Sequence, residues 1–361
     1  MAFTTKQVVS ATGLVSLLGC SLAWAQPASQ GQGTAPAQPV GQQPPEQELQ
    51  PEVQAIADFG GVLTPRGRLV LEPEFQYSHE SINRMTFEGV EVLSTLLIGV
   101  FTAQDLDRDS YTAALTGRLG VTDRLELEMK LPYVYRDETE RVTVAEVDPS
   151  FDLDRELSGN SLGDIELAAH YQLNRGQGGM PFFIGNLRYK STTGEGPFDI
   201  RRNSAGVPQE LPTGTGFHSI EPSLTMLFPS APAVYFANLG YAFNLEDDVG
   251  KRAGDISVGE VDPGDAVRLS FGMAYSINPR TSFTLGYKND FIGETDTEYV
   301  DEDGNSVRQS SNTLNVGSML LGWSYQFNQD VSVNLGLEFG ITDDAPDTLL
   351  TLRMPFGMNV F

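Results

Sequence analysis

The 361-residue sequence contains a single cysteine, Cys20. One thiol cannot form an intramolecular disulfide, and Cys20 lies in an N-terminal segment that we expect to be removed on export. The scarcity of cysteine therefore excludes a disulfide framework and thiolate chemistry in the mature chain.

Basic residues are also scarce. The chain has 23 Lys and Arg against 48 Asp and Glu, which gives a formal net charge of −25. Contacts to nucleic-acid phosphates need clustered Lys and Arg, so we expect no nucleic-acid partner.

Long apolar runs are absent after the N-terminal segment. A transmembrane helix needs about 18 or more consecutive apolar residues, so transmembrane helices are excluded there. A transmembrane β-barrel stays open, because its apolar residues alternate with polar ones and the alternation averages away in mean hydropathy.

The sequence of the N-terminal region predicts three short segments before the main domain. Residues 1–25 have the form of a secretory signal: Lys6, an apolar stretch from Val8 to Gly19, and the small-x-small site Ala23-Trp24-Ala25. Cleavage after Ala25 competes with a lipobox-like sequence ending at Cys20, which leaves lipidation of Cys20 as an alternative. Residues 26–45 are rich in Gln and Pro and predict a disordered periplasmic leader.

A short amphipathic helix is expected over residues 46–60. Its apolar side chains fall near helical spacing, and Gly60-Gly61 would end it. We regard this segment as a candidate plug, with the following apolar residues: Leu49, Val53, Ile56 and Phe59.

Residues 61–361 alternate apolar and polar side chains in segment after segment. In Arg124–Arg136, Leu125, Leu127 and Met129 share one parity, whereas the neighbouring glutamates share the other. Successive side chains of a strand point to opposite faces, so each segment has one apolar and one polar face. The pattern predicts about twelve strands of about 10 to 16 residues, the length of tilted membrane-spanning strands.

The connections between these segments sort into two alternating kinds. Turns such as Asn278–Arg280 are short, whereas Thr139–Ser158, Glu195–Pro212, Glu246–Asp262 and Thr295–Gln309 are long and mostly acidic. Short turns at one end and long loops at the other are typical of an outer-membrane barrel. The fold expected is therefore an all-β, antiparallel up-and-down transmembrane barrel.

A soluble β-sandwich would alternate in the same way, with its apolar face inside. Three features favour the inverted arrangement: too much apolar area for one core, aromatic residues near strand ends as at Tyr133 and Trp323, and Gly and Ser beside the charges on the other parity. We therefore expect the apolar face to meet lipid and the polar face to line the lumen.

The charged side chains of lumen parity are the candidate functional residues. Charge on the lipid face would cost about 2–4 kcal/mol for each Arg or Lys at the midplane, so these residues are expected inside, where they pair with one another, select solutes, or both. The pore-lining candidates are Glu72, Glu74, Arg118, Glu126, Glu128, Lys130, Glu166, His170, Arg188, Lys190, Glu221, Arg268, Lys288, Glu338 and Arg353.

Two patterns that suggest other chemistry are weak. His218-Ser219 invites a hydrolase interpretation, but adjacent strand residues point to opposite faces and cannot meet. Asp105-Leu-Asp-Arg-Asp109 resembles the start of a calcium loop, yet the glycine at the sixth position and the closing glutamate are missing. We therefore predict no catalytic residues, no metal site and no cofactor.

Short motifs resemble two known families. Gly163-Asp164-Ile165 and Leu211-Pro212-Thr213-Gly214 resemble the putative outer-membrane transporters grouped with the MetA pathway of phenol degradation. GVLTPRG at 61–67, LVLEP at 69–73, LLIG at 96–99, PYVYR at 132–136 and LRMPF at 352–356 resemble the outer-membrane pore of functional-amyloid (Fap) secretion systems. The second resemblance implies a twelve-stranded export pore whose N-terminal helix, here residues 46–59, can block the periplasmic mouth.

These observations lead to one main hypothesis and two alternatives. The main one is a gated outer-membrane export channel for an unfolded, amyloid-type polypeptide in a Gram-negative bacterium, with a periplasmic N-terminus. The alternatives are uptake of a small, aromatic solute, and a non-transporting barrel that serves as an adhesin or anchor.

The partners expected are outer-membrane lipid and lipopolysaccharide, the transported polypeptide or solute, and the barrel assembly machinery, whose recognition signal the alternation Leu350, Leu352, Met354, Phe356 resembles. A homo-oligomer stays open, although the leader contains no heptads for a coiled coil.

Overall fold

The computed structural model describes residues 63–93, 96–145, 151–176, 179–203, 208–253, 256–300 and 306–360. The expected signal segment, leader and amphipathic helix lie outside the described residues. In the part that is described, no helix has the length and apolar character needed to cross a membrane.

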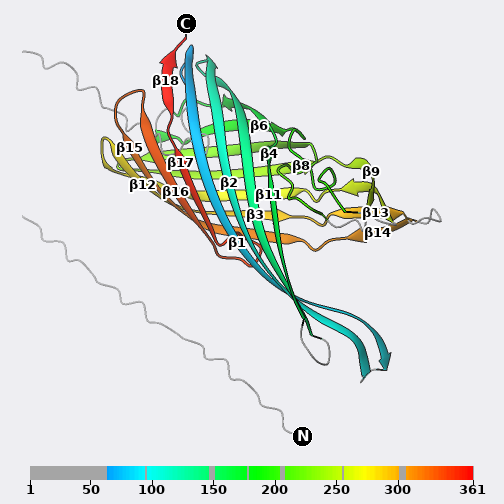
Figure 1. Cartoon of the computed structure of the whole chain (residues 1–361). Helices are drawn as coiled ribbons and strands as arrows, with labels where there is room; N and C mark the ends of the chain where they lie inside the picture. Colours follow the sequence, from blue (N-terminus) through cyan, green and yellow to red (C-terminus); the bar gives the residue numbers. More distant parts are fainter. Residues whose placement is uncertain are drawn as a thin grey trace, which may run out of the picture. The chain divides into compact units, whose positions relative to one another are not determined.

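Fourteen strands form one antiparallel sheet that closes on itself (Figure 1). They are β1 (Arg68–Leu93), β2 (Leu96–Thr122), β3 (Leu125–Ala145), β4 (Phe151–Leu162), β5 (Glu166–Gln172), β6 (Phe182–Lys190), β7 (Ser219–Ser230), β8 (Ala233–Asn244), β11 (Ala266–Asn278), β12 (Thr281–Ile292), β15 (Leu314–Gln326), β16 (Ser332–Gly340), β17 (Thr348–Arg353) and β18 (Phe356–Asn359). The end of the chain returns to the first strand: β17 pairs with β1 from Glu74 opposite Arg353 to His79 opposite Thr348.

The closed sheet is a barrel of twelve strand positions, as the alternation predicts. Two positions are shared by successive strands. Strands β5 and β4 both pair with β3, at Leu125–Lys130 and Tyr133–Val144 respectively, while β18 continues β17 along the start of β1. Closure pairs the backbone groups of every barrel strand with neighbours, which a lipid environment requires because it offers no hydrogen-bonding solvent.

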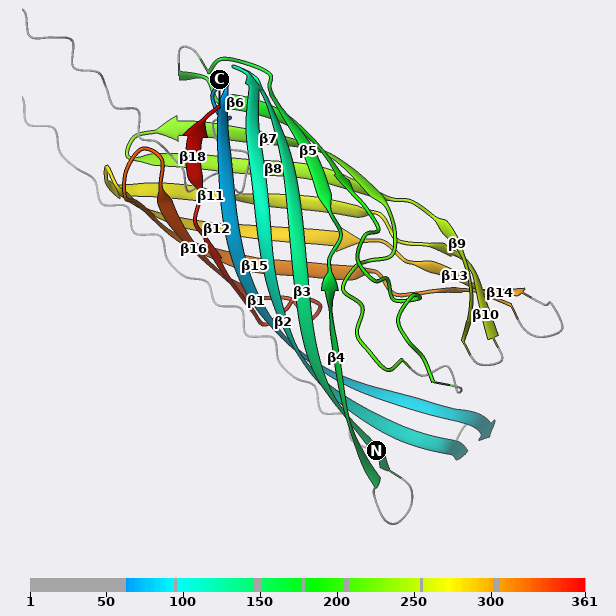
Figure 2. The same cartoon turned by 45° about the horizontal axis from the view of Figure 1, so that its top comes forward.

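Three of the strands are much longer than the sequence pattern predicts. Strand β1 has 26 residues, β2 has 27 and β3 has 21. Together with β4 they run on past the other barrel strands and curve away (Figures 1 and 2). The expected long loop Thr139–Ser158 is therefore mostly strand. The prediction of a loop was wrong because the alternation continues there through charged residues, which were interpreted as loop residues.

Two other expected loops also contain strands. Residues 246–262 and 295–309 carry β9 (Asp247–Ala253), β10 (Ile256–Asp262), β13 (Asp296–Val300) and β14 (Ser306–Ser310). These four strands form a second sheet in the order β14-β13-β10-β9. Val258, Val261, Phe217, Phe198 and Tyr299 pack together beneath it. The prediction of loops rested on the acidic composition of these segments, and it therefore missed this small apolar core.

The side chains of the barrel have the inverted arrangement. Leu239 is 57% exposed and Ile277 61% exposed, whereas Glu72 is 2% exposed and Thr225 0%. Apolar side chains therefore cover the outside of the wall, and carboxylates and hydroxyls fill the inside. This distribution is the reverse of a soluble β-sandwich and fits a wall that faces lipid.

We predict opposite effects of a lysine at two adjacent positions of β11. Phe271 is exposed on the outer face, and Ser270 lines the internal cavity. Phe271→Lys should destabilise the barrel by about 2–4 kcal/mol in phospholipid vesicles, because the charge enters hydrocarbon. Ser270→Lys, the matched control, should cost much less. Urea unfolding in vesicles measures both values, and an equal cost at the two sites would refute the assignment of the faces.

Candidate functional site

The lumen holds a cavity of about 380 Å³ lined almost wholly by polar side chains. All the predicted pore-lining residues contribute to its wall except Glu126 and Lys190. The structure adds further polar side chains that sequence reasoning did not select: Thr116, Asn186, Ser223, Thr225, Asn238, Ser270 and Asp290. Most of these are neutral, and a search restricted to charges passed over them although they share the parity of their charged neighbours.

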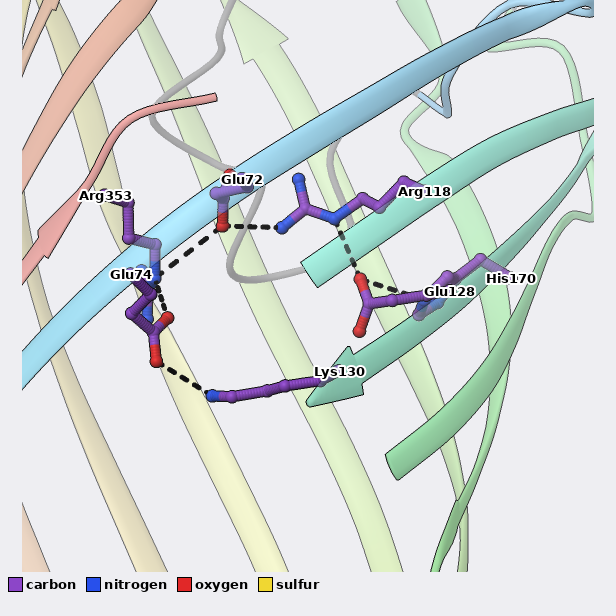
Figure 3. A network of polar contacts seen from close by, with 7 residues as sticks. All are labelled: Glu72, Glu74, Arg118, Glu128, Lys130, His170 and Arg353. Atoms are coloured by element: carbon purple, nitrogen blue, oxygen red, sulfur yellow. Dashed lines mark hydrogen bonds and ion pairs between the residues drawn. The ribbon is translucent and has the colours of Figure 1, made fainter. Parts of the chain in front are cut away.

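A network of seven residues crosses one side of this wall and is here called the lumen network: Glu72, Glu74, Arg118, Glu128, Lys130, His170 and Arg353 (Figure 3). The Arg118 guanidinium lies 3.0 Å from Glu72 Oε1 and 2.8 Å from Glu128 Oε2. Glu74 lies between two cations, with Lys130 Nζ at 2.9 Å and Arg353 Nε at 2.5 Å. Three carboxylates and three permanent cations therefore compensate one another in a small volume.

The spacing of these pairs follows from the register of the sheet. Glu72 of β1 lies opposite Thr116 of β2, and Thr116 lies opposite Lys130 of β3. The small Thr116 side chain allows Lys130 to reach across β2 to Glu74. Strands β7, β8 and β11 repeat the arrangement: Gly240 of β8 lies opposite Arg268 of β11 and Ser223 of β7. Arg268 reaches past Gly240 to Glu221, two residues from Ser223, and the ion pair measures 2.6 Å.

The opposite part of the cavity wall carries a second set of ion pairs. Arg268 also approaches Asp290 at 3.4 Å, and Lys288 pairs with Glu338. Arg188 and Glu166 are 3.7 Å apart, and the Arg188 side chain is 45% exposed. The ion pairs thus range from nearly enclosed at Glu72 to well hydrated at Arg188.

Amide and hydroxyl side chains join the two sets of ion pairs. Asn186 Nδ2 donates to Ser223 Oγ and Thr225 Oγ1, at 3.1 and 3.0 Å. Asn238 Nδ2 donates to Thr225 Oγ1 at 2.8 Å. These contacts connect β6, β7 and β8 across their lumen faces and leave little of this wall apolar.

Glu126 lies at one end of the lumen, where the chain enters the barrel. Its Oε2 accepts the Thr64 backbone N–H at 2.7 Å. The preceding residue, Leu63, is buried in an apolar cluster with Ile184, Leu227 and Phe236. The segment just before β1 is therefore held against the inside of the barrel wall. Lys190, at the end of β6, is the other predicted residue that does not line the cavity.

The connection between β6 and β7 is fixed by Asp164. The Asp164 carboxylate accepts N–H groups of Gly194 at 3.0 Å and Thr215 at 2.8 Å, as well as the Thr215 hydroxyl. A Cβ at Gly194 would lie 2.7 Å from Gly214 Cα, so both positions need glycine for close approach. The short motifs Gly163-Asp164 and Thr213-Gly214, distant in sequence, thus form one structural unit.

Farther along the same connection, Arg201 and Glu210 form a bidentate pair on the surface. The Arg201 hydrogen bonds hold the pKa of Glu210 below its usual value. Arg201 is exposed and Glu210 is half-buried, so the pair orders the loop locally and contributes little to global stability.

His218 and Ser219 lie on opposite faces of the wall, and the aspartate-rich stretch does not form a calcium loop. His218 Nδ1 lies 2.9 Å from the Tyr189 hydroxyl on the exposed side, whereas Ser219 is buried on the other face. The Asp105–Asp109 stretch lies within β2, not in a calcium loop, and Asp109 accepts a hydrogen bond from Tyr77.

Fold, inverted faces and polar lumen together define an integral outer-membrane β-barrel. The family model described as "Putative MetA-pathway of phenol degradation" matches residues 100–354, and the chain belongs to this family.

A solved structure shares the fold. An outer-membrane channel from Pseudomonas putida F1 superposes with a TM-score of 0.52 at 15% identity, covering 83% of this chain and 98% of that one. The comparison with a FadL homologue from Pseudomonas aeruginosa gives a TM-score of 0.41 at 9% identity, covering 84% of this chain and 97% of that one.

We predict that Arg118 and Arg188, two of the arginines that line the cavity, contribute very differently to the stability of the barrel. Arg118 serves two carboxylates and its side chain is 13% exposed, so Arg118→Met should destabilise the barrel by about 3–5 kcal/mol, as expected when a buried charge loses its partner. Arg188→Met, at the 45% exposed pair, should cost less than about 1 kcal/mol. Urea unfolding in vesicles compares them, and similar losses would contradict the assignment.

Proposed function

We propose that this protein is a passive outer-membrane channel for small solutes that carry hydrogen-bonding groups. The observation that supports this most directly is the lumen cavity of about 380 Å³, whose wall alternates cations, carboxylates and amides. Sites for small molecules measure about 300–1,000 Å³, so this volume suits one small solute at a time. A wholly apolar solute would gain nothing from such a wall and would displace its hydration.

A phenolic solute is the specific class that we favour. The name of the family refers to phenol degradation, and a phenol combines a small aromatic ring with one hydroxyl. The hydroxyl can donate to a lumen carboxylate or accept from an amide such as Asn238, whose neighbours Thr225 and Ser223 offer further partners. The substrate would therefore exchange hydrogen bonds along the wall without binding tightly at one point.

Export of an unfolded, amyloid-type polypeptide is the second candidate. It rests on the resemblance of motifs such as GVLTPRG and PYVYR to the Fap secretion pore. A polypeptide strand would need a wider lumen than the present cavity. The ion pairs that reach across a neighbouring strand, Lys130 to Glu74 and Arg268 to Glu221, would have to separate.

The N-terminal segment is the proposed gate. Leu63 is 6% exposed within the apolar cluster, and Thr64 is tied to Glu126, so the chain that precedes β1 is led along the lumen wall. Residues 46–59, with Leu49, Val53, Ile56 and Phe59, are separated from this point by only a few residues. They are therefore able to occupy the mouth of the barrel next to the buried Leu63.

The remaining partners follow from the same placement. The short turns and the N-terminal segment would face the periplasm, and the long strands β1–β4 would extend outward among lipopolysaccharide. The outward side chains Leu350, Leu352 and Met354 continue to Met358 and Val360, all exposed. This edge of the last strands is what we propose the barrel assembly machinery recognises.

Planar-bilayer recording tests the channel proposal. We expect small discrete conductance steps from the full chain, and a larger conductance after deletion of residues 46–59, because the gate is removed. Deletion of residues 30–43 in the leader is the matched control and should change nothing. Absence of conductance in all three proteins would refute the channel and favour an adhesin or structural anchor.

A further inference from the structure

We propose that Glu126, Glu128 and His170 form a binding site for a borderline divalent cation of the zinc class inside the lumen. One ligand atom from each of the three residues lies within 4.8 Å of the others. Glu126 and Glu128 are on β3, and His170 is directly opposite Glu126 on the neighbouring strand β5. All three side chains share the lumen face, so the register of two rigid strands brings them together.

The tautomer of His170 is set by a residue outside this group. Asn186 Nδ2 donates to Ser223 and Thr225, which directs Asn186 Oδ1 toward the imidazole. The Nδ1–H of His170 therefore donates to Asn186 Oδ1, at 2.8 Å. The remaining nitrogen, Nε2, carries a lone pair and lies 3.9 Å from Glu128 Oε2. Metal-binding histidines use one ring nitrogen as the ligand and donate the N–H of the other to such an acceptor, which fixes the tautomer and the orientation of the ring.

The charges around the group favour a cation. The Arg118 guanidinium contacts both Glu128 and Glu72. Glu126 is a further carboxylate nearby and is 6% exposed. Glu72 Oε2 is buried without a hydrogen-bond partner among the residues that the structure describes. Glu72, Glu126 and Glu128 therefore share this part of the wall with Arg118, and Arg353 approaches only Glu72 of the three. Lys130 is directed to Glu74, and Arg353 lies between Glu74, at 2.5 Å, and Glu72, at 3.9 Å.

Imidazole nitrogen with carboxylate oxygen is a ligand set that suits Zn²⁺ and similar first-row ions, and does not suit Mg²⁺ or Ca²⁺, which prefer oxygen alone. Metal–ligand bonds of about 2.0–2.2 Å require the three ligand atoms to close by about an ångström, which side-chain rotation provides. Glu128 can keep its contact with Arg118, because a carboxylate offers about four lone-pair sites.

Calorimetric titration of the folded, detergent-solubilised full chain with Zn²⁺ tests the site. We expect one saturable site per chain in the wild type, at least tenfold weaker binding in His170→Gln, and about tenfold weaker binding in Asn186→Leu, which frees the imidazole to rotate. His218→Gln is the matched control: His218 lies on the exposed side beside Tyr189, so binding should be unchanged.

Equal affinity in the wild type and His170→Gln, or a loss in His218→Gln of the same size, would overturn the proposal. Heat-modifiable gel migration checks that each variant is folded. X-ray absorption at the zinc edge of the loaded wild-type protein needs no variant: one imidazole with oxygen ligands supports the site, and oxygen ligands alone contradict it. Neither measurement depends on conductance, so the site and the channel can fail separately.

Discussion

Backbone pairing in lipid is the constraint on which the rest of the structure depends. Hydrocarbon offers no partner for an N–H or C=O group, so the strands must pair with one another and the sheet must close. Closure occurs between β1 and β17, at Glu74 opposite Arg353. The side chains of each strand point alternately outward and inward. If the outward side chains are apolar, the other half of the side chains must line the lumen, and these are the ones that carry charge.

The charged interior lowers the stability of the barrel unless its charges are paired, because enclosing an unpaired charge costs free energy. The lumen network meets this by reaching across the intervening strand. Lys130 extends past Thr116 to Glu74, and Arg268 extends past Gly240 to Glu221. A small side chain on the middle strand is therefore as necessary as the two charges. The outcome is a rigid wall whose polar groups still face a shared cavity and can exchange hydrogen bonds with a passing solute.

Alternation within segments such as Leu125–Leu131 was sufficient to predict the barrel, its inverted faces and its twelve strand positions. It could not give the lengths of β1 to β3 or the sheet formed by β9, β10, β13 and β14, since these strands carry many charged residues and their acidic composition resembles that of loops.

Pairings across the sheet were equally inaccessible. The contact of Glu74 with both Lys130 and Arg353 depends on register and on closure, which no local pattern contains. Asn186 was passed over because a neutral amide in a strand has no distinctive signal. Only its contacts, with His170 on one side and Ser223 and Thr225 on the other, show what it does.

The central claim is that the two parities of each strand meet different solvents. Single cysteines at positions 268, 269, 270 and 271 of β11, introduced after replacement of Cys20, test this most directly in proteoliposomes. A charged, water-soluble thiol reagent should modify the cysteines replacing Arg268 and Ser270 and should leave those replacing Leu269 and Phe271 unmodified. Modification of positions 269 and 271 with protection of 268 and 270 would contradict the account.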